Sequence, residues 1–159
     1  LSRTTGLSRE AFMQRMNDRA KEMNLVQTKF VDPTGIETGN VSTPLEMARI
    51  ARAVFQHEEV QKYTTTSVKY VDVINRGTQK KMTNTNWMLW KPAYDDVYVT
   101  SGKTGFLYES GWNLAVSLKP SAKDDRELLI VLFGGTSRAE SFNDAKRLAY
   151  WAWSVHDWK

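Results

Sequence analysis

The sequence contains no cysteine, only two histidines and no long uninterrupted apolar run. The absence of cysteine excludes disulfide scaffolds, zinc fingers, thiol catalysis and thiolate-held iron–sulfur clusters. Since a bilayer-spanning helix needs about 20 consecutive apolar residues, no transmembrane segment is expected in this chain. The chain starts at Leu1 without an initiator methionine or a charged-then-apolar leader. We therefore expect it to be a piece of a longer protein.

The composition is that of one folded domain. Of the 159 residues, 41% are hydrophobic and 25% are charged, which argues against a disordered chain, a coiled coil and a collagen-like fibre. The net charge of +4 is mild, and the basic residues are scattered rather than clustered, so no nucleic-acid partner is expected. His57 and His156 lie far apart without the spacing of metal ligands, so neither is expected to bind a metal.

Capping signals predict helices in the N-terminal part of the chain. Ser8 is a typical N-cap, and Asn24 favours the left-handed conformation in which a helix ends. The pair Thr43-Pro44 starts a second helix, and Glu46 is expected to reach back to the cap as in a capping box. A short helical segment is expected after His57.

Strands and a final helix are predicted in the rest of the chain. The expected strands are Ser67–Asn75, Thr78–Thr83, Tyr98–Ser101, Trp112–Leu118 and Glu127–Phe133. Because Glu127–Phe133 is almost wholly apolar, it is expected to be a central strand that is buried on both faces. Arg138–Trp153 is predicted to be a closing helix. This order of helices, antiparallel strands and a closing C-terminal helix favours an α+β fold over a doubly wound parallel sheet.

The segment Ser101–Gly105 is the sharpest local signal. Its Gly-Lys-Thr run suggests a phosphate-binding loop, but that loop needs a glycine where Val97 stands and a helix that begins at Lys103. Two interpretations remain. The segment is either a tight bend between strands with an exposed lysine, or the Lys-Thr-Gly motif of penicillin-recognising serine acyl-transferases, which lies on a sheet edge beside the nucleophile. There the lysine supplies charge, the threonine hydroxyl binds a substrate carboxylate, and the glycine lets an extended peptide approach the strand.

Several segments, in order along the chain, resemble those of D-alanyl-D-alanine carboxypeptidases, the low-molecular-mass penicillin-binding proteins. The similar segments are the helix Phe12–Leu25, the turn Thr28–Gly35 with Asp32 in place of the usual Asn, the helix that includes Ser42–Ala51, the N-x-N segment Asn84–Asn86, the Lys-Thr-Gly motif within Gly102–Gly105 and the return strand Ser110–Leu114. Arg138 resembles the arginine that helps to hold the terminal carboxylate of the substrate. The resemblance covers nearly the whole chain.

Two of the three motifs of that family are missing. The sequence has no Ser-x-x-Lys, and its only Ser-x-Asn is Ser141-Phe142-Asn143, which follows Lys-Thr-Gly and falls on the predicted closing helix. In the family both motifs precede the position of Leu1. Residues 1–159 are therefore expected to be the C-terminal part of one DD-peptidase catalytic domain, with a mainly helical and hairpin region over 1–92 and antiparallel strands plus the closing helix over 93–159.

The resemblance implies a serine-type D-Ala-D-Ala carboxypeptidase that acts on peptidoglycan stem peptides, binds penicillin and other β-lactams, and works outside the cytoplasm, in the periplasm or on the cell-wall side of the membrane. It assigns a catalytic charge to Lys103 and substrate binding to Thr104, Gly105 and Arg138. The backbone N–H of Phe106 would be one oxyanion donor. This chain alone, without the serine nucleophile, is expected to be inactive.

The alternative is a non-catalytic cell-wall or carboxylate-binding module derived from the same fold. In either case a sheet of three strands would leave apolar surface uncovered, so the expected partner is the N-terminal half of the same catalytic domain or a second copy of the chain. Asp95-Asp96 and Glu109 are expected to be solvated loop residues. Most of the six tryptophans are expected to pack in the core or at an interface.

Overall fold

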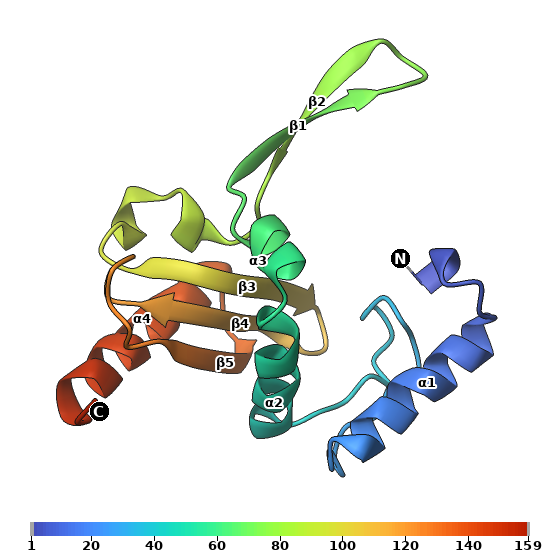
Figure 1. The fold of residues 1–159 in the computed structure, drawn as a ribbon, viewed down its shortest axis with the longest axis horizontal. Coiled ribbons are helices and arrows are strands. Elements are labelled where there is room, and N and C mark those ends of the chain that lie inside the picture. The colour runs from blue at the N-terminus through green and yellow to red at the C-terminus, as the bar shows by residue number, and fades with distance from the viewer. Residues whose placement is uncertain (1, 159) are drawn as a thin grey trace.

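The computed structural model describes residues 2–158 and shows a mixed helix and antiparallel sheet architecture (Figure 1). The predicted α+β class is confirmed. The elements in chain order are η1 (Ser2–Thr4), α1 (Arg9–Glu22), α2 (Pro44–Phe55), α3 (Glu58–Thr64), β1 (Val68–Val73), β2 (Thr78–Thr83), η2 (Trp87–Leu89), η3 (Pro92–Tyr94), β3 (Tyr98–Leu107), β4 (Gly111–Lys119), β5 (Leu128–Gly135) and α4 (Arg138–Val155).

The central feature is an antiparallel sheet in the order β3-β4-β5, with α4 on one face and α2 across the other (Figure 1). The prediction that Glu127–Phe133 forms a central strand buried on both faces is wrong: β4 is central, β5 lies at an edge, and Ile130 alone among the residues of β5 is fully buried, while Phe133 is exposed. Side chains of β5 point alternately toward α4 and toward α2. A strand with a helix over each face is apolar throughout even when one of its edges is unpaired, which explains the misleading pattern.

The core lies between the sheet and α4. Alternate residues of β4 face the helix, and Leu114 and Val116 pack there with Phe142 and Ala145 of α4. Phe142 is 1% exposed and stacks near the rings of Trp87 and Tyr94, so it anchors the first turns of α4 to the sheet. Ser141-Phe142-Asn143 is therefore part of a packed helix, as expected for a chance match to Ser-x-Asn.

The predicted helix caps are confirmed, with one exception. The Ser8 hydroxyl accepts the N–H of Ala11, and Asn24 has a φ of 55° just after α1. At α2 the Thr43 hydroxyl accepts the N–H of Glu46. The Glu46 carboxylate, however, does not reach back to the cap.

Instead, the buried Glu46 carboxylate ties α2 to the segment that precedes it. It accepts hydrogen bonds from the Gln27 N–H and the Thr28 hydroxyl. Burial by itself would raise the pKa of Glu46, but these hydrogen bonds and the charge of Arg49 lower it overall. The carboxylate serves a long-range contact that a local capping pattern does not reveal.

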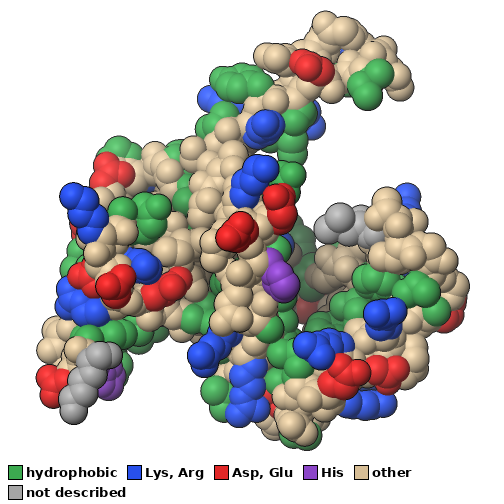
Figure 2. Space-filling model, in the orientation of Figure 1, with side chains coloured by type: hydrophobic (Ala, Val, Ile, Leu, Met, Phe, Trp, Pro, Cys, Tyr) green, Lys and Arg blue, Asp and Glu red, His purple; other side chains and the backbone are tan. Residues whose placement is uncertain are grey.

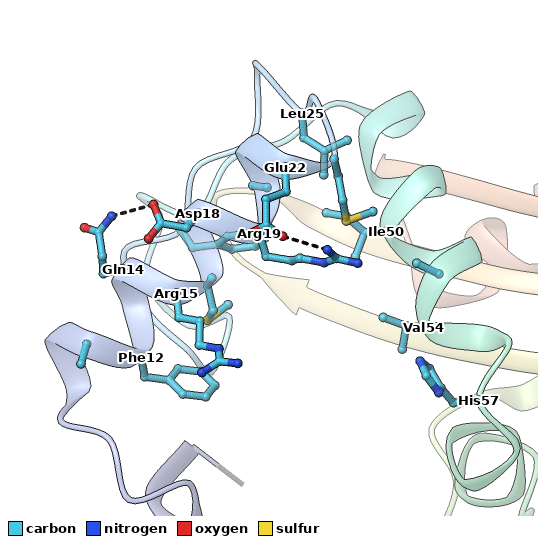
Figure 3. Close-up of a pocket in the computed structure, with 16 residues that line it drawn as sticks. Phe12, Gln14, Arg15, Asp18, Arg19, Glu22, Leu25, Ile50, Val54 and His57 are labelled. Atoms are coloured by element: carbon cyan, nitrogen blue, oxygen red, sulfur yellow. Dashed lines mark hydrogen bonds and ion pairs between the residues drawn. The ribbon is translucent and has the colours of Figure 1, made fainter.

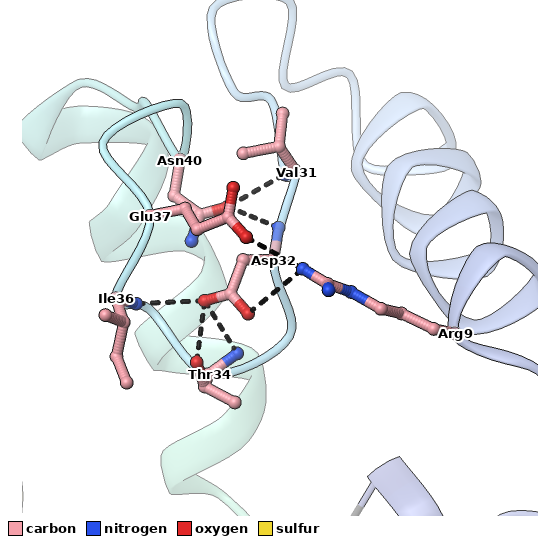
Figure 4. Close-up of polar contacts among 7 residues, drawn as sticks. All are labelled: Arg9, Val31, Asp32, Thr34, Ile36, Glu37 and Asn40. Carbon is pink, nitrogen blue, oxygen red and sulfur yellow. Dashed lines mark hydrogen bonds and ion pairs between the residues drawn. The ribbon is translucent and has the colours of Figure 1, made fainter.

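Asp32 organises the loop between α1 and α2 (Figure 4). Its Oδ2 accepts hydrogen bonds from the hydroxyl and N–H of Thr34 and from the N–H of Ile36. These bonds hold the pKa of Asp32 at about 2, well below the ordinary range. Asn40 closes the other side of the loop by accepting the N–H groups of Val31 and Asp32. These hydrogen bonds therefore give the loop a defined conformation.

Two parts of the chain extend away from the sheet. The helix α1 lies apart from α2, and the β1–β2 hairpin projects from the body of the molecule (Figure 1). Of the tryptophans, Trp153 packs in the core as expected, whereas Trp151 is 58% exposed and Trp90 and Trp158 are exposed as well, so packing of these three at an interface stays a prediction. Leu148 on the closing helix is exposed too.

Candidate functional site

Lys103, Thr104 and Gly105 lie within β3, an edge strand of the sheet. Each is paired across to β4, and Thr104 lies opposite Leu114. The interpretation of this segment as a tight bend is therefore wrong. Because β3 pairs only with β4 in the sheet formed by residues 2–158, its other edge offers backbone donors and acceptors to an extended peptide.

Successive residues of this motif face opposite sides of the sheet. The partners of Thr104 and Phe106 are Leu114 and Trp112, which lie on the side of α4, whereas Lys103 lies on the side of α2. Lys103 is exposed, its Nζ donates to the Thr104 carbonyl oxygen at 2.6 Å, and it forms no ion pair with any residue in 2–158. Its charge remains available to an anion near the strand.

The hydroxyl of Thr104 has a partner that the sequence did not single out. Its Oγ1 lies 2.6 Å from Oγ1 of Thr85, which belongs to the Asn84–Asn86 segment after β2. Asn84 holds that segment in place by donating to the carbonyls of Thr64 and Thr66. The N-x-N resemblance marked this segment, but only the tertiary structure places its middle residue on the Lys-Thr-Gly strand.

Arg138 is the first residue of α4, and its guanidinium lies over two indole rings. The guanidinium carbon is 4.6 Å from the ring centroid of Trp112 and 5.5 Å from that of Trp87. Since Trp112 pairs with Phe106, Arg138 lies on the Thr104 side of the sheet, near the end of β3. It forms no ion pair within the described part of the chain, and the two rings support an unneutralised cation.

Gly102 makes room for a buried amide under the strand. A Cβ at this position would lie 2.8 Å from Asn86 Nδ2 and 3.5 Å from Val116 Cγ2. Asn86 is 1% exposed, its Oδ1 accepts the N–H of Met88, and its Nδ2 has no hydrogen-bond partner among residues 2–158. A Cβ on Gly105 would meet only Asn113 Cβ at 3.7 Å, an ordinary contact. Gly102, just before the motif, and Gly105, within it, thus have different roles in packing.

The acidic residues near the site were predicted to be solvated. Asp96 is not simply solvated: its carboxylate pairs with Lys146 at 2.7 Å and accepts the hydroxyl of Tyr150 at 2.8 Å. Burial opposes ionisation of Asp96, but these two partners lower its pKa overall. Asp96 therefore fastens the loop before β3 to α4. Glu109 is exposed and forms no ion pair within residues 2–158, as expected.

A hollow with a volume of about 1040 Å³ lies between α1 and α2 (Figure 3). Apolar side chains line much of it, including Phe12, Leu25, Ile50 and Val54, and no residue of β3 takes part. Figure 2 shows the same hollow as a gap between the lobe that carries α1 and the rest of the molecule. A second cavity, of about 580 Å³, touches Gly105 and Phe106.

Two other kinds of site were sought in the described part of the chain. Residues 2–158 contain no group of three or more His, Asp or Glu side chains placed to hold a metal ion. Nor does this part of the chain contain a helix with both the length and the apolar character that a membrane span requires.

Comparisons with known proteins agree on one family. Residues 2–137 match the family described as D-alanyl-D-alanine carboxypeptidase, peptidase S11. The chain is 32% identical to the D-alanyl-D-alanine carboxypeptidase DacF of Bacillus subtilis over 94% of its own length, and 29% identical to a D-alanyl-D-alanine endopeptidase of Haemophilus influenzae over 92%. It spans 37% and 49% of those two relatives, respectively, so it corresponds to half of their length or less.

Solved structures share the fold. The Streptomyces K15 DD-transpeptidase superposes with a TM-score of 0.77 at 22% identity, covering 92% of this chain and 55% of that one. The D-alanyl-D-alanine carboxypeptidase from Mycobacterium tuberculosis gives a TM-score of 0.75 at 18% identity, with the same two coverages. In both cases the matched part is little more than half of the solved chain.

Proposed function

Because the chain belongs to the peptidase S11 family of D-alanyl-D-alanine carboxypeptidases, we propose that it forms the C-terminal part of a serine-type D-Ala-D-Ala carboxypeptidase. Its substrates are peptidoglycan stem peptides, and β-lactams acylate the same site. Since that polymer lies outside the cytoplasm, the enzyme acts in the periplasm or on the cell-wall side of the membrane. The single observation that carries the proposal is the placement of Lys-Thr-Gly on an open strand edge, with Thr104 and Arg138 on one side of the sheet.

The proposed chemistry is acyl transfer through a serine outside these 159 residues. The serine oxygen attacks the carbonyl carbon of the penultimate D-Ala, and its proton goes to a neighbouring base. The bond to the terminal D-Ala then breaks, and its amine takes up a proton as it leaves. Water hydrolyses the resulting ester and regenerates the serine. No metal or organic cofactor takes part in the proposed reaction.

Residues of this chain bind the substrate and stabilise charge in that scheme. The Thr104 hydroxyl donates a hydrogen bond to the terminal carboxylate, and the Arg138 guanidinium is the charge partner of that carboxylate. Lys103 supplies positive potential beside the nucleophile. The Phe106 N–H donates to the oxygen that becomes negative in the tetrahedral intermediate. Gly105 lets the peptide backbone lie against β3, because it places no side chain there.

The proposed partner of this chain is the N-terminal half of the same catalytic domain, which carries the Ser-x-x-Lys segment. Two observations support this. The hollow between α1 and α2 is lined by apolar side chains, which a monomer rarely leaves open to water over a large area. In addition, the solved chains of the same fold extend well beyond the part that this chain matches. A second copy of the chain is the competing occupant.

One observation favours a second candidate function. The sequence contains no Ser-x-x-Lys, so a relative that binds carboxylates or cell wall without catalysis would also have this strand edge. The two functions differ in one measurement. A labelled penicillin forms a covalent adduct with the protein in its full natural length only if a nucleophilic serine is present.

The test uses the full-length protein and measures D-Ala release from a pentapeptide that ends in D-Ala-D-Ala. Arg138→Ala and Thr104→Val are each expected to reduce kcat/KM about 10- to 150-fold, the typical effect of losing a hydrogen bond to a charged group. Arg147→Ala is the matched control, because Arg147 lies on the same helix but pairs with Asp144. Equal losses on a substrate with an amidated C-terminus would contradict the proposed carboxylate site.

A further inference from the structure

Aromatic rings, and no carboxylate of residues 2–158, hold the side chain of Arg138. The nearest acidic residue along α4 is Glu140, and its carboxylate lies 3.7 Å from Arg147 instead. A carboxylate partner would orient the guanidinium but would also neutralise it. The face of an aromatic ring attracts the cation and leaves the N–H groups at the edge of the guanidinium free to bind an anion. The support that Arg138 has is therefore the kind that suits an anion-binding arginine.

Trp112 is the ring that serves Arg138 alone. The guanidinium carbon lies 4.6 Å from the centroid of Trp112, and no other cation of the described residues lies over this ring. Trp87 differs, because Lys91 Nζ lies 3.0 Å from its centroid and Arg138 is further away, at 5.5 Å. Trp87 also packs against Phe142 of the core. Trp112 is therefore the closer of the two rings and the one more specific to Arg138.

The backbone at the end of β5 brings this ring and the guanidinium together. The pairing of β4 with β5 shifts register next to Trp112, at a β-bulge in which Gly134 has a φ of 71°. The residue opposite Trp112 is Gly135. A Cβ on Gly135 would lie 2.3 Å from Ser141 Oγ and 3.4 Å from Trp112 Cβ. The bulge and the missing side chain thus let the start of α4, with Arg138, lie against the indole.

On its other side, Trp112 contacts Phe106. The two ring centroids are 4.3 Å apart, and the two residues are partners across β3 and β4. In the proposed function, the Phe106 N–H is the oxyanion donor and Arg138 is the charge partner of the terminal carboxylate. Because one indole contacts both residues, it fixes the position of the guanidinium relative to the strand that binds the peptide.

We propose that Trp112 is a positioning residue of the carboxylate site, whose ring holds the Arg138 guanidinium by cation–π attraction in the orientation that binds the substrate carboxylate. Trp112 acts through Arg138. This inference rests on the proposed function and adds to it a residue that takes no part in the chemical steps. Since Arg138 is half-buried, loss of the ring is expected to lower kcat/KM about 2- to 30-fold, the range between an exposed and a desolvated cation–π contact.

The test measures D-Ala release by the full-length protein from a pentapeptide that ends in D-Ala-D-Ala. Tryptophans with one, two or three ring fluorines are introduced at position 112. Fluorine withdraws electron density from the ring face and nearly preserves the shape, so a merely structural role predicts no trend. We expect log(kcat/KM) to fall steadily with the number of fluorines, toward the value of Trp112→Leu. Trp112→Phe keeps an aromatic face and should lose less activity than Trp112→Leu.

The matched control is the same set of replacements at Trp151. This residue is also on α4, is 58% exposed, and its ring contacts His156. These replacements should leave kcat/KM unchanged, and a substrate with an amidated C-terminus should not respond to fluorination at position 112. If fluorination has no effect while Arg138→Ala still lowers kcat/KM, or if both substrates respond equally, the positioning role is wrong. The proposed function fails separately, if the unmodified protein releases no D-Ala.

Discussion

The hydroxyl pair Thr85–Thr104 leads to a prediction that can be worked out in detail. If Thr104 donates its proton to the substrate carboxylate, the Oγ1···Oγ1 contact of 2.6 Å requires Thr85 to donate to Thr104. Thr85 is then a positioning residue that orients the Thr104 hydroxyl and polarises it. Thr85→Val removes this donor and keeps the shape of the side chain.

The expected loss follows from the kind of hydrogen bond. A bond between neutral groups contributes about 0.5–1.5 kcal/mol, so Thr85→Val should lower kcat/KM about 2- to 13-fold. Thr104→Val removes a hydrogen bond to a charged group, so the loss of transition-state stabilisation should be larger, about 1.5–3 kcal/mol. Thr85→Ser keeps the hydroxyl and should restore most of the activity.

The assay is a double-mutant cycle on D-Ala release by the full-length protein. If Thr85 acts only through Thr104, the double variant Thr85→Val/Thr104→Val should be no slower than Thr104→Val alone. A substrate with an amidated C-terminus should be much less sensitive to either change. Additive losses in the double variant, or an equal effect of Thr85→Val on the amidated substrate, would refute this reasoning.

Four further predictions concern the chain itself. The isolated 159-residue chain should neither release D-Ala nor form an adduct with labelled penicillin, and covalent labelling seen by mass spectrometry would contradict the proposed position of the nucleophile. Light scattering should show that the isolated chain associates with itself, and adding the N-terminal half should raise its melting temperature; a clean 18.2 kDa monomer unchanged by that half would argue against the proposed partner. Gly102→Ala should lower the free energy of unfolding by about 1–3 kcal/mol, because its Cβ would overlap Asn86 Nδ2. In calorimetry this should lower Tm by about 2–12 °C. Gly105→Ala is the control and should change Tm much less, because its Cβ position is open. Because the folded pKa of Asp32 is about 2, below its unfolded value, its contribution to stability is present above about pH 4 and is lost as the pH falls toward 2. Asp32→Asn should remove that part of the pH dependence in acid unfolding curves, and an unchanged profile would show that the carboxylate does not contribute.

Local features of this fold could be predicted because their causes are local. The caps at Ser8 and Thr43 depend on the N–H groups three residues further along, and the left-handed end at Asn24 depends on one residue. The β1–β2 hairpin follows from alternation around a turn that contains Gly77. The resemblance to the carboxypeptidase family rested on motifs that are continuous in sequence, and the family comparison confirms it.

Long-range partners could not be predicted in this way. The Glu46 carboxylate has the spacing of a capping box but binds Gln27 and Thr28 instead. The partners of the Glu46 carboxylate depend on where the preceding segment folds back against α2, and no pattern within the helix encodes that position. The apolar sequence of β5 likewise reflects its contacts with helices on both faces of the sheet. It does not indicate which strand pairs with either edge of β5.

The sequence by itself therefore determined the fold class, the family and the Lys-Thr-Gly motif, but not that this motif lies within a strand. These depend on hydrophobic periodicity, capping and contiguous motifs, which act over a few residues. Only the tertiary structure decided that Thr85 touches Thr104, that Arg138 lies over Trp112, and that a cavity with Glu109 in its lining opens beside Gly105. The physical reason is the same in each case. Such contacts join segments that are far apart along the chain or belong to different elements, and strand order and helix packing bring them together.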